Sequence, residues 1–206
     1  MLKKDLGLLV LIIVVGAVVA IINPRFLSPI NIANTANLVG LFGIFAIGQG
    51  FVIITGGIEL SVGSIIALLG VIFIDLIANH QVAWPVASLV VLVIGALMGL
   101  AHGLLITRLR LQPFVVTLCG LLIYRGIARF YTADGTAGFP FGASFPGLEW
   151  LTTGRTDIVA LLSGGELQSV PIPHAFFIML VIAVAMWIVL HRSVFGRHLY
   201  AVGKNE

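Results

Sequence analysis

The stretch Gly56–Ser64, GGIELSVGS, decides the fold of this chain, because it places an acid, Glu59, between two long apolar segments. Glycine readily ends a helix, and serine readily caps the start of one. We therefore expect a tight turn in which Gly56 and Gly57 end the first helix with positive φ. The Ser61 side chain would then accept from free amides of the second helix, leaving Glu59 at the cytoplasmic interface.

A second interpretation of this stretch is functional, as a kink near a transport path in which Glu59 fixes helix ends or contacts a partner subunit. Gln49 is a polar residue in the apolar segment before the turn. Polar groups inside a membrane usually face the bundle interior or a cavity, so Gln49 either bonds a neighbouring helix or touches substrate. The candidate pathway residues are Gly56, Gly57, Glu59, Ser61, Gly63, Ser64 and Gln49.

Composition places the chain in a lipid bilayer. It is 60% hydrophobic and 9% charged, with a mean hydropathy of +1.17, whereas a soluble domain carries about 25% charged residues. A helical span needs roughly 20 apolar residues. We therefore expect an all-α polytopic bundle of about six spans. The first span is expected to be an uncleaved membrane anchor and not a signal peptide. The expected spans are 6–22, 38–55, 61–78, 84–107, 113–131 and 173–190.

The distribution of basic residues predicts the orientation of these spans. Cytoplasmic loops carry an excess of lysine and arginine, and most basic residues lie on one side if both termini are cytoplasmic. The residues placed inside are Lys3, Lys4, Arg108, Arg110, Arg192, Arg197 and Lys204. Residues 132–172 then form a long periplasmic loop without clear helices, in which residues 158–162 are a candidate short interfacial helix.

Glycines spaced four apart in the fourth expected span lie on one helical face, where small residues let helices approach closely. These helix-packing candidates are Gly95, Gly99 and Gly103. In the fifth span, Arg125 either snorkels to the outer headgroups or forms an ion pair, with Asp75 as the candidate acid. His102 is an intramembrane candidate for either a proton relay or a packing hydrogen bond.

Nothing in the sequence predicts catalysis. The histidines lack the spacing of metal ligands, and no basic run indicates binding to nucleic acid. A phosphate-binding loop around Lys204 would need glycine at position 198 and serine or threonine at position 205; these are His198 and Asn205. We therefore expect a protein that is not an enzyme, without catalytic residues, cofactor or metal.

Four motifs together resemble a known family. GGIELSVGS (56–64) is similar to a GGIDLSVGS pattern with Glu59 in place of aspartate, and QPFVVTL (112–118) is similar to P-F-[IV]-V-T-L. YRG (124–126) is similar to L-R-G, and FGRHLYAVG (195–203) to F-G-R-x-[LI]-Y-A-[IV]-G. In this order the motifs resemble the permease subunit of ATP-binding-cassette importers for monosaccharides of the ribose, arabinose, xylose and galactofuranose type.

The chain departs from this family pattern at particular positions. His102 stands where the family usually has asparagine before glycine, and Lys204 stands where it usually has a second glycine. Family members continue well beyond the position of Glu206. The resemblance therefore implies that residues 1–206 are the N-terminal part of one transmembrane permease domain, C-terminally truncated. It places Gly196, Arg197 and Gly203 in the cytoplasmic tail near the region that couples to the ATPase.

The resemblance also implies the function and the partners. It implies a permease of the bacterial inner membrane that translocates a sugar using ATP hydrolysed by a separate subunit. Its partners would be a cytoplasmic ATP-binding subunit, a periplasmic sugar-binding protein and a second permease copy, in a homodimer or heterodimer. The alternatives are an ion-coupled carrier using Glu59, Asp75 and His102, a permease of the branched-chain amino-acid type, and a membrane scaffold.

Overall fold

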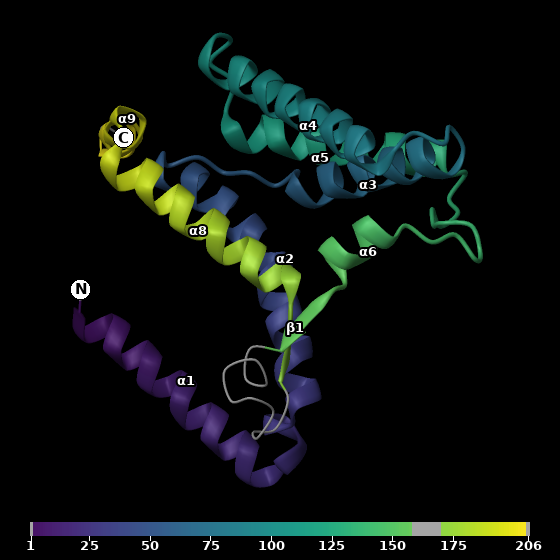
Figure 1. Ribbon diagram of the computed structural model, residues 1–206. Helices are drawn as coiled ribbons and strands as arrows, with labels where there is room; N and C mark the ends of the chain where they lie inside the picture. The colour runs from purple at the N-terminus through teal and green to yellow at the C-terminus, as the bar shows by residue number, and fades with distance from the viewer. Residues whose placement is uncertain (1, 158–169, 205–206) are drawn as a thin grey trace. The chain divides into compact units, whose positions relative to one another are not determined.

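The predicted helical architecture is confirmed in its main feature (Figure 1). The computed structural model describes residues 2–157 and 170–204, so the candidate helix at 158–162 lies outside the described residues. The described helices are α1 (Leu2–Ile22), the 3-10 helix η1 (Pro24–Leu27), α2 (Pro29–Ile54), α3 (Val62–Ala78), α4 (Trp84–Thr107), α5 (Pro113–Tyr131), α6 (Pro146–Thr152), α8 (His174–Arg192) and α9 (Val194–Lys204).

Among the described residues, four helices are long and apolar enough to cross a membrane: α2, α4, α5 and α8. The apolar parts of the other two expected spans, Leu6–Ile22 and Val62–Ala78, are shorter. Six spans and cytoplasmic termini therefore stay predictions. The side chains of these helices are largely exposed in the isolated chain, as expected where lipid replaces water around an apolar surface.

The second span begins earlier than expected, at Pro29 instead of Leu38. The reason is a helix start that hydropathy does not reveal. The Ser28 hydroxyl accepts from the Asn31 N–H at 3.4 Å, and Pro29 takes the first helical position, where its missing N–H carries no penalty. Serine followed by proline therefore begins the helix while the sequence is still polar.

The expected loop at 132–172 contains regular structure, which corrects the prediction of a loop without clear helices. It includes the short helix α6. It also includes strand β1 (Arg155–Asp157), which pairs antiparallel with β2 (Pro171–Pro173) so that Thr156 lies opposite Ile172. Proline at both ends of β2 restricts the ladder bonds that this short strand can form.

The chain divides into two compact units. The first comprises Met1–Ala46 and Glu149–Met186. Within it α2 closely approaches the start of α8 at Gly40, where an added Cβ would lie 2.6 Å from the backbone nitrogen of Phe176. A glycine is needed at this crossing because the helix backbones nearly touch.

The second unit, Ile47–Leu148 with Trp187–Glu206, contains the residues of the candidate site. Helix α3 packs against both α4 and α5, and Figure 1 shows these three helices side by side. Successive helices run in opposite directions, so the start of α3, the end of α4 and the start of α5 gather at one end of the unit. The apolar side chains buried along the three helices are Leu68, Ile77, Ala87, Val116 and Ala128.

The three candidate packing glycines of α4 have few close neighbours in the described part of the chain. An added Cβ at Gly95 would lie 3.1 Å from the Leu69 side chain, whereas Gly99 and Gly103 have no such neighbour within 4 Å. Only Gly95 therefore lies near α3 within this chain. A helix-packing role for Gly99 and Gly103 stays a prediction.

Candidate functional site

The turn after α2 is built by one left-handed glycine. Gly56 has φ 75°, a conformation that glycine adopts without steric cost. The Gly57 N–H donates to the Val52 carbonyl at 3.0 Å and the Gly56 N–H to the Ile53 carbonyl at 3.0 Å. This bond pair is the Schellman motif, which needs left-handed φ at a single residue. The prediction of positive φ is therefore confirmed for Gly56 and wrong for Gly57.

The start of α3 is held by Glu59, not by the Ser61 side chain, so the predicted serine cap is wrong. The backbone N–H and the hydroxyl of Ser61 both donate to Glu59 Oε1, each at 2.6 Å. Ser61 is completely buried, and the Ser64 hydroxyl donates to its carbonyl at 2.7 Å. A carboxylate at a helix N-terminus is stabilised by the helix dipole. Glu59 therefore turns back onto the helix that follows it.

A buried histidine connects this carboxylate to two further helices. His102 of α4 places Nδ1 3.4 Å from Glu59 Oε2, and its Nε2 lies 2.9 Å from the Tyr124 hydroxyl of α5. The His102 side chain is 7% exposed and that of Glu59 is 19% exposed. A carboxylate only accepts, so the Nδ1 proton points to Glu59. In the neutral ring, Nε2 then accepts from the Tyr124 O–H.

The backbone of the turn is also held from both sides. The Gln49 amide of α2 donates to the Glu59 carbonyl at 2.9 Å. The buried Thr117 hydroxyl of α5 lies 3.3 Å from the Ile58 carbonyl and 2.9 Å from the Pro113 carbonyl, and its one hydrogen serves one acceptor at a time. Irregular backbone in a membrane protein needs such partners, because lipid offers none.

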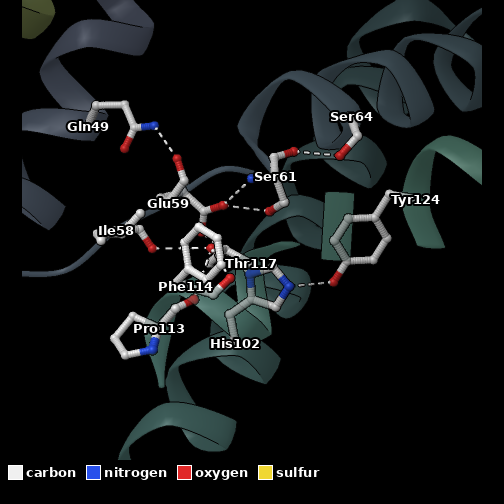
Figure 2. Close-up of polar contacts among 10 residues, drawn as sticks. All are labelled: Gln49, Ile58, Glu59, Ser61, Ser64, His102, Pro113, Phe114, Thr117 and Tyr124. Carbon is white, nitrogen blue, oxygen red and sulfur yellow. Dashed lines mark hydrogen bonds and ion pairs between the residues drawn. The ribbon is translucent and has the colours of Figure 1, made fainter. Parts of the chain in front are cut away.

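We call Gln49, Glu59, Ser61, His102 and Tyr124 the polar cluster; Figure 2 shows them converging on the turn. No fully buried side-chain nitrogen or oxygen in residues 2–157 and 170–204 lacks a hydrogen-bond partner. A satisfied polar network fixes one arrangement of the helices that supply it. The polar cluster can therefore set the positions of α2, α3, α4 and α5 around the turn.

Sequence analysis found only part of this site. It singled out Gln49, Glu59 and Ser61, and it considered His102 as a relay or packing group, but it missed Tyr124 and Thr117. The available signal was spacing. Thr117, Gly120 and Tyr124 lie three and four residues apart, which puts them on one face of a helix. The structure brings Ser64 to the turn, whereas an added Cβ at Gly63 would meet nothing within 4 Å.

Two of the positions at which the chain departs from the resembled pattern face each other. Glu59 replaces aspartate and His102 replaces asparagine, and the nearest atoms of the two side chains are 3.4 Å apart. At this contact, glutamate lengthens the carboxylate side chain by one methylene group, and histidine replaces an amide by a larger imidazole. The polar cluster therefore contains a matched pair, which the sequence alone presented as unrelated differences.

Gly120→Ala is expected to disrupt the polar cluster. An added Cβ would lie 2.6 Å from His102 Nε2, so the ring must move away from Tyr124. Overpacking of this kind costs about 1–3 kcal/mol, against a helix-propensity gain of at most about 1 kcal/mol. We expect a lower melting temperature in detergent, measured by the change in tryptophan fluorescence on heating.

The matched control is Gly126→Ala in the same helix, where nothing lies within 4 Å of the added carbon. It gains the same propensity without the clash and is expected to keep or slightly raise the melting temperature. Equal melting temperatures for the two variants would contradict the tight packing of His102 against α5.

The predicted ion pair between Arg125 and Asp75 is not formed. Asp75 accepts from the Asn79 amide at 2.7 Å and lies 3.4 Å from His80 Nε2. Within residues 2–157 and 170–204, Arg125 has no acid at ion-pair distance. Asp75 shares a cavity with Tyr131, and Arg125 is six residues earlier, about 9 Å along the helix at 1.5 Å per residue.

The tail residues lie on α9, an amphipathic helix that sequence analysis did not predict. The Ser193 hydroxyl accepts from the Gly196 N–H at 3.1 Å and so caps its start. A Cβ at Gly203 would run into the Ile54 carbonyl oxygen. The rings of Phe195 and Phe51 are 6.5 Å apart. Helix α9 therefore packs against the end of α2, immediately before the glycine turn.

Arg197 lies on the same helix and is exposed. Gly196 is buried at the corner between α8 and α9, where an added Cβ would meet the Leu190 carbonyl oxygen. The three tail residues thus differ in role. Two glycines allow close backbone approach, and the arginine remains accessible.

Comparison with known proteins finds a matching family and several relatives, all of them described as transport permeases. Residues 31–206 match the family described as "Branched-chain amino acid transport system / permease component". The chain is 34% identical over 198 residues to the ribose import permease protein RbsC of Haemophilus influenzae, covering 95% of this chain and 56% of that protein. It is 36% identical over 209 residues to RbsC of Bacillus subtilis, covering 98% and 56%.

A third relative is the galactose/methyl galactoside import permease protein MglC of Escherichia coli, 28% identical over 217 residues, covering 98% of this chain and 60% of that protein. No solved structure matches the chain. The chain thus spans 56–60% of the length of these relatives.

Proposed function

The chain belongs to the family described as "Branched-chain amino acid transport system / permease component", and from this premise we propose that it is the membrane-spanning permease part of an ATP-driven sugar importer. It is a multi-pass protein of the bacterial inner membrane, as expected for this family and for its long apolar helices. We propose that it crosses the membrane six times, with both termini in the cytoplasm.

The names of the relatives are the observation on which the proposed substrate class rests. Several relatives that match nearly the whole of this chain are named as import permeases for ribose and for galactose and methyl galactoside. Although the family description mentions branched-chain amino acids, these names favour a monosaccharide. We propose a pentose or hexose as the transported molecule.

In this proposal the chain changes between conformational states and does not itself catalyse a chemical reaction. A transporter driven by partners needs at least two states whose relative stability each partner changes. The polar cluster is suited to this role because it joins four helices through a few hydrogen bonds around one turn. Helix α9 is suited to transmit a signal to the turn, since it contacts α2 at Ile54 and Phe51.

The proposed partners supply the activities that the permease lacks. A separate cytoplasmic subunit would hydrolyse ATP, a periplasmic binding protein would deliver the sugar, and a second permease copy would complete the pathway. A second copy is consistent with Gly99 and Gly103 of α4, whose missing side chains leave open space in the described chain. Small residues at such positions let helices from another subunit approach closely.

The proposal is tested by searching the neighbouring genes for an ATPase and a periplasmic binding protein and reconstituting the chain with those found. We expect D-ribose or D-galactose to enter proteoliposomes only when ATP is enclosed with the ATPase, and binding protein to stimulate ATP hydrolysis. Each component omitted in turn serves as the control.

The alternative functions predict different results. An ion-coupled carrier would use the chain of ionisable groups from Glu59 through His102 to Tyr124. Its uptake would collapse with the proton gradient and continue without ATP. Uptake of leucine or valine in place of sugars would instead identify an amino-acid permease. Either result would contradict the proposed function.

A further inference from the structure

A polar cavity of about 310 Å³ lies at the end of α3 and α5 that is opposite the polar cluster. In the proposed orientation this end faces the periplasm. The cavity is of the size that small-molecule sites have, about 300–1,000 Å³. Its polar lining comes from the last turns of two helices and the loop after them: Asp75, Asn79, Tyr131, Thr132 and Thr136.

The carboxylate in this cavity retains hydrogen-bonding capacity. Asp75 accepts from Asn79 through Oδ1, lies near His80 through Oδ2 and also accepts from the Tyr131 hydroxyl, and its side chain is 17% exposed. An ionised carboxylate has about four acceptor sites, so these three neighbours leave about one acceptor position free. They also supply donors to its negative charge, which reduces the attraction of the site for a simple cation.

Between the lining residues Thr132 and Thr136 the chain makes a turn in an unusual conformation. Ala133 and Asp134 have φ of 48° and 61°, a left-handed conformation that residues other than glycine seldom adopt. The turn is closed by the Asp134 N–H donating to the Arg129 carbonyl at 2.9 Å, and the Arg129 guanidinium donates to the Asp134 carboxylate at 2.5 Å.

This turn returns the chain to the end of α3, where Thr136 and Pro140 complete the lining. Strained backbone of this kind costs on the order of 1–3 kcal/mol per residue and is concentrated at ligand clamps and active sites. The strained residues therefore connect two lining residues of the cavity, and the Arg129–Asp134 pair secures the turn between them.

We propose that this cavity is a binding site for a neutral polyhydroxyl molecule, a monosaccharide, on the outer side of the transport path. A sugar needs acceptors and donors close together for neighbouring hydroxyls, and Asp75, Asn79 and Thr136 offer both kinds. Its C–H faces need apolar surface, which Val71, Ile74 and the ring of Tyr131 add to the lining. The choice of a sugar rests on the proposed function, whereas the site rests on the lining residues.

The test is equilibrium binding of radiolabelled D-ribose and D-galactose to the full chain in nanodiscs, without ATPase or binding protein. We expect saturable binding of at least one of them. Thr136→Val removes an exposed hydroxyl and is expected to weaken that binding about tenfold, the effect of one lost ligand hydrogen bond. Asp75→Leu is expected to abolish it. The control, Thr107→Val, removes an exposed hydroxyl at the other end of α4 and is expected to leave binding unchanged.

Two results would overturn the site. One is the absence of saturable sugar binding to the wild-type chain, and the other is Thr136→Val binding as tightly as wild type. Saturable binding of radiolabelled methylammonium that D-ribose and D-galactose do not displace would assign the cavity to a cation instead. If Asp75→Leu does not fold, Thr136→Val alone decides.

The outcome for the site can be separated from that for the proposed function. If the reconstituted complex takes up sugar with ATP but the chain alone binds none, only the outer site fails. If the wild-type complex takes up no sugar under any condition, the proposed function fails, whatever the chain binds alone.

Discussion

Glu59→Leu is expected to unfold the start of α3 and to abolish ATP-driven uptake by the reconstituted complex. The Glu59 carboxylate is the acceptor for the Ser61 N–H, the Ser61 hydroxyl and His102 Nδ1. A buried donor left without a partner costs about 1–3 kcal/mol. The amide of Ser61 and the imidazole together should therefore lower the free energy of unfolding by on the order of 3 kcal/mol, measured as the melting temperature in detergent.

The matched control is Glu59→Gln, which keeps the side-chain length. Its carbonyl oxygen still accepts from Ser61, and its amide can donate to Nδ1 if His102 moves its proton to Nε2 and donates to Tyr124. We expect a small loss of stability and partial uptake. Equal damage from both variants would show that the charge, rather than an acceptor at this place, is what the turn requires.

The pairing of Glu59 with His102 makes a further comparison possible within the same experiment. Glu59→Asp and His102→Asn should each destabilise the chain, because each shortens one side of a 3.4 Å contact. The double variant should be more stable than the sum of the single effects predicts, by about 1 kcal/mol, as is common for residues in contact. Strict additivity would mean that the two positions are independent.

Gly203→Val is expected to separate α9 from the end of α2 and to uncouple ATP hydrolysis from uptake. The new side chain would occupy the space of the Ile54 carbonyl oxygen and lie close to Thr55. Backbone cannot yield as a flexible side chain does, so the last turn of α9 must move. We expect uptake to fall at least about tenfold, a change of 1.4 kcal/mol or more in coupling free energy.

Val202→Ala is the control for this variant, because Val202 is next in sequence and exposed. It should leave uptake and binding-protein-stimulated ATPase activity unchanged. Normal uptake by Gly203→Val would contradict a coupling role for the contact between α9 and α2. A loss of membrane insertion or folding would be seen in the melting temperature and would assign Gly203 to stability alone.

Hydropathy predicted the long helices well where apolar residues fill the whole span. The bounds 84–107 and 113–131 agree with α4 and α5, since Pro85 and Pro113 mark sharp helix starts. It missed the start of α2 and the whole of α9, because both helices begin at hydroxyl caps, Ser28 and Ser193, in stretches that are not apolar.

The site was harder to predict than the helices for a physical reason. Glu59 and Ser61 are two residues apart, and a local rule about serine caps gave the wrong donor and acceptor. The choice between them depends on His102 and Thr117, which lie far along the chain and hold the carboxylate and the backbone from other helices. Spacing can place Thr117 and Tyr124 on one helical face, but it cannot say which helix that face meets.

The turn between α2 and α3 also constrains how the protein is made. Its contacts with His102 and Thr117 join residues 43 and 59 positions apart. At about 5–20 residues per second, Thr117 is synthesised about 3–12 s after Ile58. Helix α3 ends at Ala78, so the completed α2–α3 hairpin waits about 2–8 s for Thr117 at the same rate. In that time the Ile58 carbonyl and Glu59 Oε2 lack their partners from α5 and α4. Biogenesis of this protein therefore includes a period in which the insertion machinery, water or lipid headgroups must hold the turn until α5 arrives.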